Sequence, residues 1–226
     1  MDELREYQVS KNLISYISPN STAAEAYRAL RTNLFYSSVD KKIKSITISS
    51  ADIQDGKTVT ACNLAISIAN AGSKVLLIDA DLRKPNVHKQ FIIPNRAGLT
   101  NLLMEECELG EALFMVEDIP NLDILVSGTI PPNPSEILSS IKIKELIEYL
   151  SKKYDLILID SPPLGYVSDG IILAGITDGV ILTVAAKVTK INHAQTAVKD
   201  LQKVDANILG VIMTKVKRKS DEYRYY

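Results

Sequence analysis

Six short apolar runs, set at wide spacing, constrain the fold of this chain more than any other feature. They cover residues 43–49, 75–79, 122–126, 156–160, 180–184 and 208–213, and most of them are rich in Ile and Val and do not alternate with polar residues. Continuous apolar runs of this length are typical of strands buried on both faces, as in a parallel sheet. Helical patterns over residues 58–71, 141–153 and 189–204 lie between most of them. This alternation predicts an α/β fold with a doubly wound, mostly parallel sheet.

Two local patterns predict further helices. Thr22 and Glu25 have the spacing of a capping box, which predicts a helix with Thr22 as its N-cap, continuing over residues 26–36. The proline-rich break at residues 131–134 predicts another helix from about Ser135. With no repeat or linker in between, we expect one domain over residues 1–214. A flexible, basic and tyrosine-rich tail is expected over residues 215–226.

Composition excludes several classes of protein. The 26 basic and 27 acidic residues leave a net charge of −1, which argues against a nucleic-acid partner. The longest apolar stretches reach only five or six residues, short of the ~20 that cross a membrane. The N-terminus lacks the layout of a signal peptide. Two cysteines, Cys62 and Cys107, are too few for a disulfide framework, so we expect a protein of the reducing cytoplasm.

The aromatic residues are biased in kind and in position. There are ten Tyr, three Phe and no Trp, and Tyr223, Tyr225 and Tyr226 occupy three of the last four positions. Tyrosine commonly buries its ring at the edge of an aliphatic core. We expect that packing role for Tyr27, Tyr36, Tyr149, Tyr154 and Tyr166. The terminal cluster needs a separate explanation.

Residues 51–58 fit the pattern of a phosphate-binding loop, with Ala51 in place of the first Gly. The segment follows a predicted strand and opens a predicted helix, which is the context that the pattern requires. In such a loop Lys57 reaches the β- and γ-phosphates, and the Thr58 hydroxyl can bind Mg²⁺. A plain Gly-Lys turn before a helix is the alternative. We expect the nucleotide to contact Asp52, Ile53, Gln54, Asp55, Gly56, Lys57, Thr58 and Val59.

Three acidic residues stand at the ends of predicted strands. Asp79 ends the run at 75–79 and Asp81 follows two residues later, while Asp160 ends the run at 156–160. Ligands of open α/β sheets bind at the carboxyl ends of the strands. Each acid alone is explained by a helix cap, but three beside a phosphate loop favour an Mg²⁺-nucleotide site.

Together these motifs resemble the bacterial tyrosine kinases of capsular and exopolysaccharide synthesis. The matching segments span nearly the whole chain: the loop at 51–58, Asp79-x-Asp81, Asp160-Ser161-Pro162-Pro163, the helix at 25–33 with Glu25, Arg28 and Arg31 as E-x-x-R-x-x-R, residues 127–136, and the terminal tyrosines. The phosphate loop is common to many ATPases, whereas the combination is specific to this family.

The resemblance implies a P-loop NTPase architecture like that of partitioning ATPases, with ATP and Mg²⁺ as cofactors. It implies that Lys57, Asp79 and Asp81 are catalytic and that Thr58, Asp81 and Asp160 hold the metal. The division of labour, with Asp79 as the base and Asp81 on the metal, follows from the resemblance alone. Tyr223, Tyr225 and Tyr226 are the implied phosphoacceptors, and they would be modified in trans.

The family also implies partners. Glu25, Arg28 and Arg31 lie along one helical face, where a capping box with surface charge is one interpretation and a subunit contact the other. The resemblance implies the contact, in a homo-oligomeric ring that is expected to be an octamer. It further implies the split Gram-positive arrangement. In that arrangement a separate membrane activator recruits the cytoplasmic kinase to the inner face of the membrane, and a tyrosine phosphatase opposes it. The activity would regulate polysaccharide synthesis and export.

The chain departs from the family pattern at Ile53-Gln54-Asp55, where the family usually has Pro-Gly-Glu, at Thr214 and in the shortness of its tyrosine cluster, and two other functions remain open. Gln54 stands where the family has a Gly, and Thr214 stands where it has Asn. A partitioning or division-site ATPase is one rival, but it would carry a second signature Lys where this chain has Asp52. A nucleotide-binding regulatory module without transfer activity is the other. His88 and His193 receive no role, and Cys62 is expected to be a small buried residue.

Overall fold

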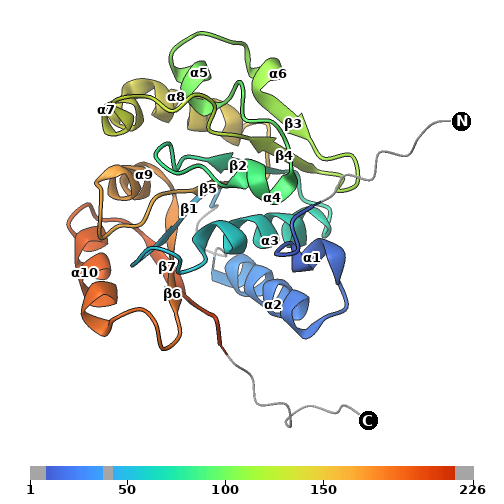
Figure 1. Ribbon diagram of the computed structural model, residues 1–226, viewed down its shortest axis with the longest axis vertical. Helices are drawn as coiled ribbons and strands as arrows, with labels where there is room; N and C mark the ends of the chain where they lie inside the picture. The colour runs from blue at the N-terminus through green and yellow to red at the C-terminus, as the bar shows by residue number, and fades with distance from the viewer. Residues whose placement is uncertain (1–8, 38–42, 217–226) are drawn as a thin grey trace, which may run out of the picture.

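A twisted sheet of seven strands runs through the computed structural model, which describes residues 9–37 and 43–216 (Figure 1). The spatial order is β3-β4-β2-β5-β1-β6-β7. Only the β3–β4 pair is antiparallel, so the doubly wound, mostly parallel sheet is confirmed. The strands are β1 (Ser45–Ser50), β2 (Val75–Asp79), β3 (Leu113–Met115), β4 (Leu122–Leu125), β5 (Leu156–Asp160), β6 (Gly179–Ala185) and β7 (Ile208–Thr214).

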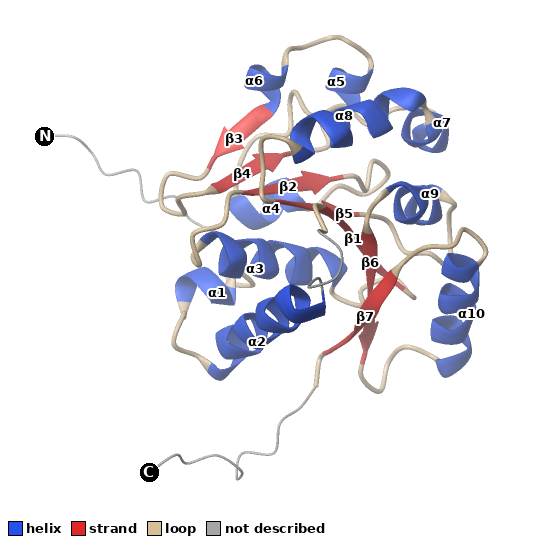
Figure 2. Cartoon of the chain, turned by 180° about the vertical axis from the view of Figure 1, so that it is seen from behind, coloured by secondary structure: helices blue, strands red, loops and turns tan. Residues whose placement is uncertain are grey.

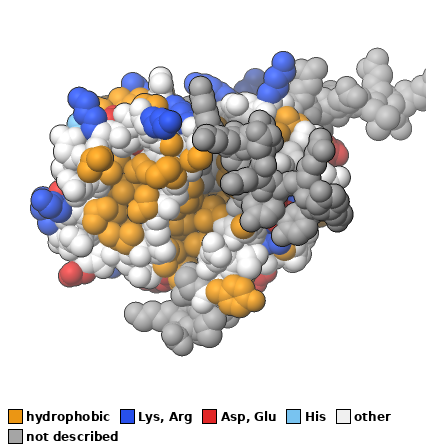
Figure 3. All heavy atoms as spheres, turned by 90° about the horizontal axis from the view of Figure 1, so that it is seen from below, with side chains coloured by type: hydrophobic (Ala, Val, Ile, Leu, Met, Phe, Trp, Pro, Cys, Tyr) orange, Lys and Arg blue, Asp and Glu red, His pale blue; other side chains and the backbone are white. Residues whose placement is uncertain are grey.

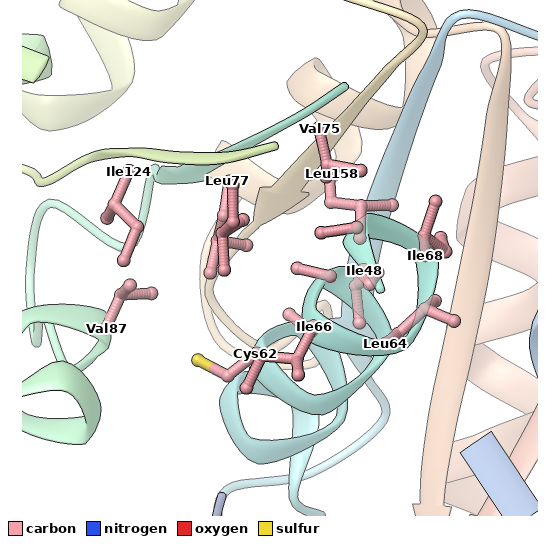
Figure 4. Close-up of a cluster of buried hydrophobic side chains, with 14 of the residues drawn as sticks. Ile48, Cys62, Leu64, Ile66, Ile68, Val75, Leu77, Val87, Ile124 and Leu158 are labelled. Atoms are coloured by element: carbon pink, nitrogen blue, oxygen red, sulfur yellow. The ribbon is translucent and has the colours of Figure 1, made fainter. Parts of the chain in front are cut away.

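Successive residues of the central strands pack on opposite faces of the sheet. In β2, Val75 and Leu77 belong to one buried cluster, whereas Leu76 and Ile78 belong to another. Figure 4 shows the first cluster, in which Leu77 and Leu158 lie against helix α3 (Lys57–Ala69). Because both faces are covered, β2 and β5 are apolar up to their terminal Asp instead of alternating.

The helices divide between the two faces (Figures 1 and 2). One face carries α1 (Ile14–Ile17), α2 (Thr22–Ser37), α3 and α4 (Val87–Phe91). The other carries α5 (Leu99–Leu103), α7 (Pro134–Ser139), α8 (Ile141–Ser151), α9 (Asp169–Ile176) and α10 (Ile191–Gln202). Helix α6 (Leu109–Ala112) leads into the edge strand β3.

Strand β7 forms the other edge of the sheet and leaves apolar side chains uncovered. Val211 is 56% exposed and Met213 is 63% exposed, and both line a groove of about 670 Å³ beside α10. Ile191, at the start of α10, is exposed on the same groove. Seen from below, hydrophobic side chains gather on this side of the molecule (Figure 3).

The start of α2 corrects the predicted cap. Ser21, not Thr22, is the N-cap: its hydroxyl accepts the N–H of Ala24 at 3.1 Å, and its carbonyl accepts the N–H of Glu25 at 3.0 Å. Glu25 therefore does not close a capping box but pairs with Arg28. The helix expected from about Ser135 is confirmed as α7. Tyr223, Tyr225 and Tyr226 lie outside the described residues.

Candidate active site

The phosphate loop joins β1 to α3 at the carboxyl end of the sheet. Among the described residues no side chain caps the first N–H groups of α3, which face the loop and can bind an anion. Gly56 makes the turn with φ +86°, a left-handed conformation that favours glycine. The predicted strand–loop–helix context of the motif is therefore present.

Asp55 supports the loop from within. Its side chain is buried and accepts the backbone N–H of Asp52 at 2.8 Å and the hydroxyl of Thr189 at 2.6 Å. Its carbonyl accepts the hydroxyl of Thr214, at the end of β7, at 2.7 Å. The side chain of Asp55 is thus occupied by Thr189, just before α10, and by the backbone of the loop, while Thr214 ties the last strand to the loop through the Asp55 carbonyl.

Asp52 connects the loop to two residues that the sequence did not single out for a site. Its carboxylate accepts the hydroxyl of Tyr166 and lies 2.8 Å from Nδ1 of His193 in α10. The hydrogen bonds from Tyr166 and His193 lower the pKa of Asp52 to about 2. His193, to which sequence analysis assigned no role, and Tyr166 thereby hold the outer side of the phosphate loop.

Gln54 adopts a conformation that an L-residue disfavours. Its φ is +64°, at the position where the family has glycine. The left-handed region costs a residue with a Cβ on the order of 1–2 kcal/mol. The side chain is exposed, so no buried contact offsets this strain.

Replacing Gln54 by glycine should therefore stabilise the fold slightly. Glycine removes the strain but is more flexible in the unfolded chain, so the free energy of unfolding should rise by up to about 1 kcal/mol. Urea unfolding followed by circular dichroism measures this. The matched variant Gln54→Ala keeps the Cβ and should not be stabilised. An equal gain in both variants would show that the backbone conformation is not the cause.

Lys57 lies between two of the three predicted acids. Its Nζ is 2.9 Å from Asp81 Oδ2 and 3.5 Å from Asp160 Oδ1. Burial by itself lowers the pKa of Lys57, but the two carboxylates outweigh it and raise that pKa above its usual value. The Thr58 hydroxyl donates to Asp160 at 2.6 Å. The residues predicted to bind phosphate and metal are thus brought together.

The oxygen atoms around Lys57 suit a hard divalent cation. Among the described residues, no three His, Cys, Asp or Glu side chains converge as a ready metal cage. The site instead offers the carboxylates of Asp81 and Asp160 and the hydroxyl of Thr58. Mg²⁺ prefers few protein oxygens and completes its shell with water and phosphate. The donor set therefore fits Mg²⁺ bound together with a nucleotide.

Asp79 lies deeper than the other two acids. It is fully buried and stands opposite Asp160 in the register of β2 and β5. Its oxygens accept the backbone N–H groups of Asn86 and Val87 at 2.9 Å and of Asp81 at 3.3 Å. Burial, followed by the charge of Asp160, raises the pKa of Asp79 well above its usual value. The carboxylate thus fixes the segment between β2 and α4.

A pocket of about 670 Å³ opens over the loop and over Asp81. Of the residues predicted to contact nucleotide, Ile53, Gln54, Gly56, Lys57, Thr58 and Val59 line it. Sequence analysis missed its other cations, which are Arg83, Lys84, Lys89 and Lys215. The surplus of positive charge suits a polyphosphate ligand.

Arg83 is held in place by a buried acid. Its guanidinium donates to Asp169, at the start of α9, at 2.8 Å and to Ser135, in α7, at 2.9 Å. Asp169 is fully buried, and its partnership raises the pKa of Arg83. In the sequence, only its position two residues after Asp81 could have indicated that Arg83 belongs to the site, because its partners are distant in sequence.

The tyrosines expected to pack behave differently from one another. Tyr154 is buried, and its hydroxyl donates to Asp123 at 2.7 Å. The expectation of a packed ring is wrong for Tyr36, which is 75% exposed, for Tyr149, which is 48% exposed, and for Tyr166, which is 55% exposed on the pocket. Cys62 is fully buried, as expected.

A phosphate loop backed by strand-end carboxylates defines a P-loop nucleotide-binding domain. Residues 43–213 match the family model described as an AAA domain. Tyrosine-protein kinase YwqD of Bacillus subtilis is 41% identical over 98% of this chain and 94% of its own length. Putative tyrosine-protein kinase CapB of Staphylococcus aureus is 34% identical over 92% of both chains.

Solved structures agree with the sequence relatives. The crystal structure of the chimerical protein CapA2B2 superposes with a TM-score of 0.89 at 33% identity, over 93% of this chain and 92% of the other. The chain belongs to the family of bacterial tyrosine kinases, and it is a protein-tyrosine kinase.

The rival partitioning ATPases share the fold at a greater distance. The septum site-determining protein MinD from Pyrococcus horikoshii, complexed with Mg-ADP, matches with a TM-score of 0.66 and 26% identity, over 78% of this chain and 72% of that one. Their signature Lys is replaced by Asp52, which here binds Tyr166 and His193. Both observations favour the kinase.

Proposed function

We propose that this kinase phosphorylates its own C-terminal tyrosines Tyr223, Tyr225 and Tyr226, with one copy serving another, and so regulates capsular or extracellular polysaccharide synthesis. The observation that carries the proposal is the position of Lys215. This residue follows β7 and lines the same pocket as Lys57, so the tail starts at the rim of the site. Tyr223 follows eight residues later, and about 27 Å of extended chain is enough for the tail to reach the pocket of a neighbouring copy.

The proposed mechanism uses the side chains of the pocket. Lys57 neutralises charge on the β- and γ-phosphates, while backbone N–H groups at the start of α3 hold the other oxygens. Thr58, Asp81 and Asp160 would hold Mg²⁺, which offsets phosphate charge when it is bound. Asp79 is the candidate base that orients or deprotonates the acceptor hydroxyl, because a phenol is a weak nucleophile at neutral pH.

Replacing Asp79 by asparagine tests the assignment of the base. The substitution should lower kcat by on the order of 100-fold and leave the Kd for nucleotide within about twofold, because a base acts on the acceptor and not on ATP binding. Initial rates of tyrosine phosphorylation and fluorescent-nucleotide titration measure the two quantities. If kcat stays near normal, Asp79 is not the base. If Kd rises in proportion to the loss of rate, Asp79 serves only to fix the segment before α4.

Incubation with Mg-ATP tests the proposed function against its rivals. Phosphotyrosine in the peptide that carries residues 223–226 supports the proposal. Phosphate release without labelled tyrosine would indicate a partitioning-type ATPase, and neither signal would indicate a regulatory module. Either of these last two results would contradict the proposal.

The proposal extends to assembly and partners. We propose a homo-oligomeric ring, an octamer by the resemblance, which a separate membrane activator recruits to the inner face of the membrane and a tyrosine phosphatase opposes. No helix in the described part of the chain is long and apolar enough to cross a bilayer. The two sequence relatives are nearly matched in length by this chain, which fits a split kinase.

Glu25, Arg28 and Arg31, on one face of α2, allow the proposed oligomer to be tested. Glu25 and Arg28 form an exposed pair, while Arg31 turns inward and donates to the carbonyl of Ser67 in α3 at 2.6 Å. Replacing all three by alanine should reduce the mass in solution to that of one chain, measured by light scattering after size exclusion. Lys144→Ala, on the exposed side of α8, is the matched control and should leave the mass unchanged. An unchanged mass in the triple variant would exclude this face as the contact.

A further inference from the structure

The groove between β7 and α10 combines exposed apolar side chains with positive charge. Val211 and Met213 of β7 are more than half exposed in it, and Ile191 of α10 lines it as well. Its charged lining residues are Lys187 and Lys199, and no acidic side chain of the described residues lines it. Exposed apolar surface of this kind marks an interaction site. The groove therefore suits a ligand that is both aromatic and anionic.

Strand β7 also offers an unpaired backbone edge beside the groove. Among the described strands it pairs only with β6. The edge of a sheet presents N–H and C=O groups that can pair with a further strand. Val211 and Met213 are two residues apart and both line the groove, so a strand added to this edge can lay every second side chain over them.

The C-terminal segment of the chain begins at this edge. β7 ends at Thr214, one residue after Met213, and residues 217–226 follow shortly afterwards. Four residues, 217–220, are enough for a turn between antiparallel strands, so residues 221–226 can return along β7. Tyr223 and Tyr225 share one face of an extended segment, because they are two residues apart. Their spacing matches that of the two exposed β7 side chains.

Charge determines which form of the segment fits the groove. Residues 217–226 carry four basic and two acidic side chains, so the unmodified segment is repelled by Lys187 and Lys199. A phosphate on tyrosine adds about −1.5 to −2 charges, and two of them reverse the sign of the segment. The tyrosine rings can then contact the apolar lining while the phosphates pair with the two ammonium groups.

We propose that the groove between β7 and α10 binds the chain's own C-terminal segment, as an added antiparallel strand, once Tyr223 and Tyr225 are phosphorylated. The inference rests on the proposed phosphorylation of the tail. A segment bound in its own groove is withdrawn from the nucleotide pocket of another copy. Docking would therefore release the phosphorylated tail from the kinase that modified it.

A synthetic peptide tests the requirement for phosphate. The probe is residues 217–226 with phosphate on Tyr223 and Tyr225 and a fluorophore at its N-terminus. It is titrated, by fluorescence anisotropy, against the full chain with phenylalanine at 223, 225 and 226. Its Kd should be lower than that of the unphosphorylated peptide by about tenfold or more, because only the phosphates pair with the groove lysines. Equal affinity of the two peptides would overturn the proposal.

Charge-reversal variants locate the binding site of the phosphorylated peptide. Lys187→Glu combined with Lys199→Glu should raise its Kd about tenfold or more. The control is Lys144→Glu combined with Lys152→Glu, which makes the same change in net charge on exposed residues in and just after α8. The control should leave the Kd within about twofold. An equal rise in both variants would show that the peptide senses net charge and not the groove.

Hydrogen exchange tests whether the segment binds its own chain as a strand. Phosphotyrosine is installed at 223 and 225 of the full chain by peptide ligation, so that no kinase activity is needed. Backbone amides of residues 208–214 should exchange about tenfold more slowly than with unmodified tyrosines, and α8 should not change. This protection should persist on tenfold dilution. Protection that is lost on dilution would assign the groove to the tail of a second copy, and no protection would exclude the added strand.

The outcomes separate this inference from the proposed function. A tail that is labelled with Mg-ATP, together with a phosphopeptide that does not bind the groove, would overturn only the inference. A synthetic phosphorylated tail that docks, in a chain that never labels its own tail with Mg-ATP, would overturn only the proposed phosphorylation.

Discussion

Replacing Lys57 by methionine should lower the initial rate of tyrosine phosphorylation by on the order of 1,000-fold at saturating Mg-ATP. Methionine has a similar length but cannot neutralise charge on the β- and γ-phosphates. The quantity to measure is phosphotyrosine formed per minute. Lys84→Met is the matched control, because Lys84 lines the same pocket and its side chain makes no ion pair among the described residues. Its rate should stay within about tenfold of the native rate.

The Lys57 prediction needs a check on folding. Removing the ammonium leaves Asp81 and Asp160 without their cation, and breaking a buried pair from one side costs about 3–5 kcal/mol. Lys57→Arg keeps the positive charge between the acids, so it should retain more stability than Lys57→Met while still transferring poorly. A folded Lys57→Met chain that keeps more than about a tenth of the native rate would contradict the assigned role of Lys57.

Replacing Tyr223, Tyr225 and Tyr226 together by phenylalanine should lower total phosphotyrosine about tenfold. The substitution removes the acceptor oxygens but keeps the rings, and Lys215 is the last of the described residues that line the pocket. Quantitative phosphotyrosine mass spectrometry measures the loss. A chain with Tyr36→Phe and Tyr149→Phe carries two other exposed tyrosines as its control and should be labelled at the native level. Undiminished label in the tail variant would show that the acceptor lies elsewhere.

Most of the sheet could be predicted, because burial on both faces leaves a pattern within each strand's own sequence. β2 and β5 coincide with the apolar runs at 75–79 and 156–160, since residues buried on both faces must be apolar without a break. β3 was missed because Leu113, Phe114 and Met115 form a short, antiparallel edge strand that is only partly buried. Helices α4, α5 and α6 were missed because elements of four or five residues carry no periodic pattern and depend on tertiary packing.

The candidate site, too, could be predicted from the sequence only in part. Lys57, Thr58, Asp81 and Asp160 could be expected to converge, because a loop after a parallel strand and acids at neighbouring strand ends share one edge of the sheet. The partners of Asp52 could not be expected. Tyr166 is 114 residues and His193 is 141 residues from Asp52 in the sequence, and neither lies in a motif that predicts a contact with the loop.

Asp55 shows that a sequence motif does not predict the orientation of every side chain in it. The motif placed it among the nucleotide contacts, whereas its side chain is buried and binds Thr189 and the Asp52 backbone. A pattern of residues gives the path of the loop but not which side chains turn inward. The sequence showed that Gln54 stands where the family has glycine. The structure shows why this matters, because Gln54 adopts a positive φ that strains a residue with a Cβ.

A mixing experiment tests most directly whether one copy of this kinase phosphorylates the tail of another. One chain carries Lys57→Met and keeps its tail tyrosines, and the other keeps Lys57 and carries phenylalanine at 223, 225 and 226. The two are incubated together with Mg-ATP, and phosphotyrosine is mapped on the tail of the Lys57→Met chain. The account predicts label there at a rate that rises with the concentration of the active chain. An unlabelled tail in the mixture, under conditions where the native chain labels its own, would contradict transfer between copies.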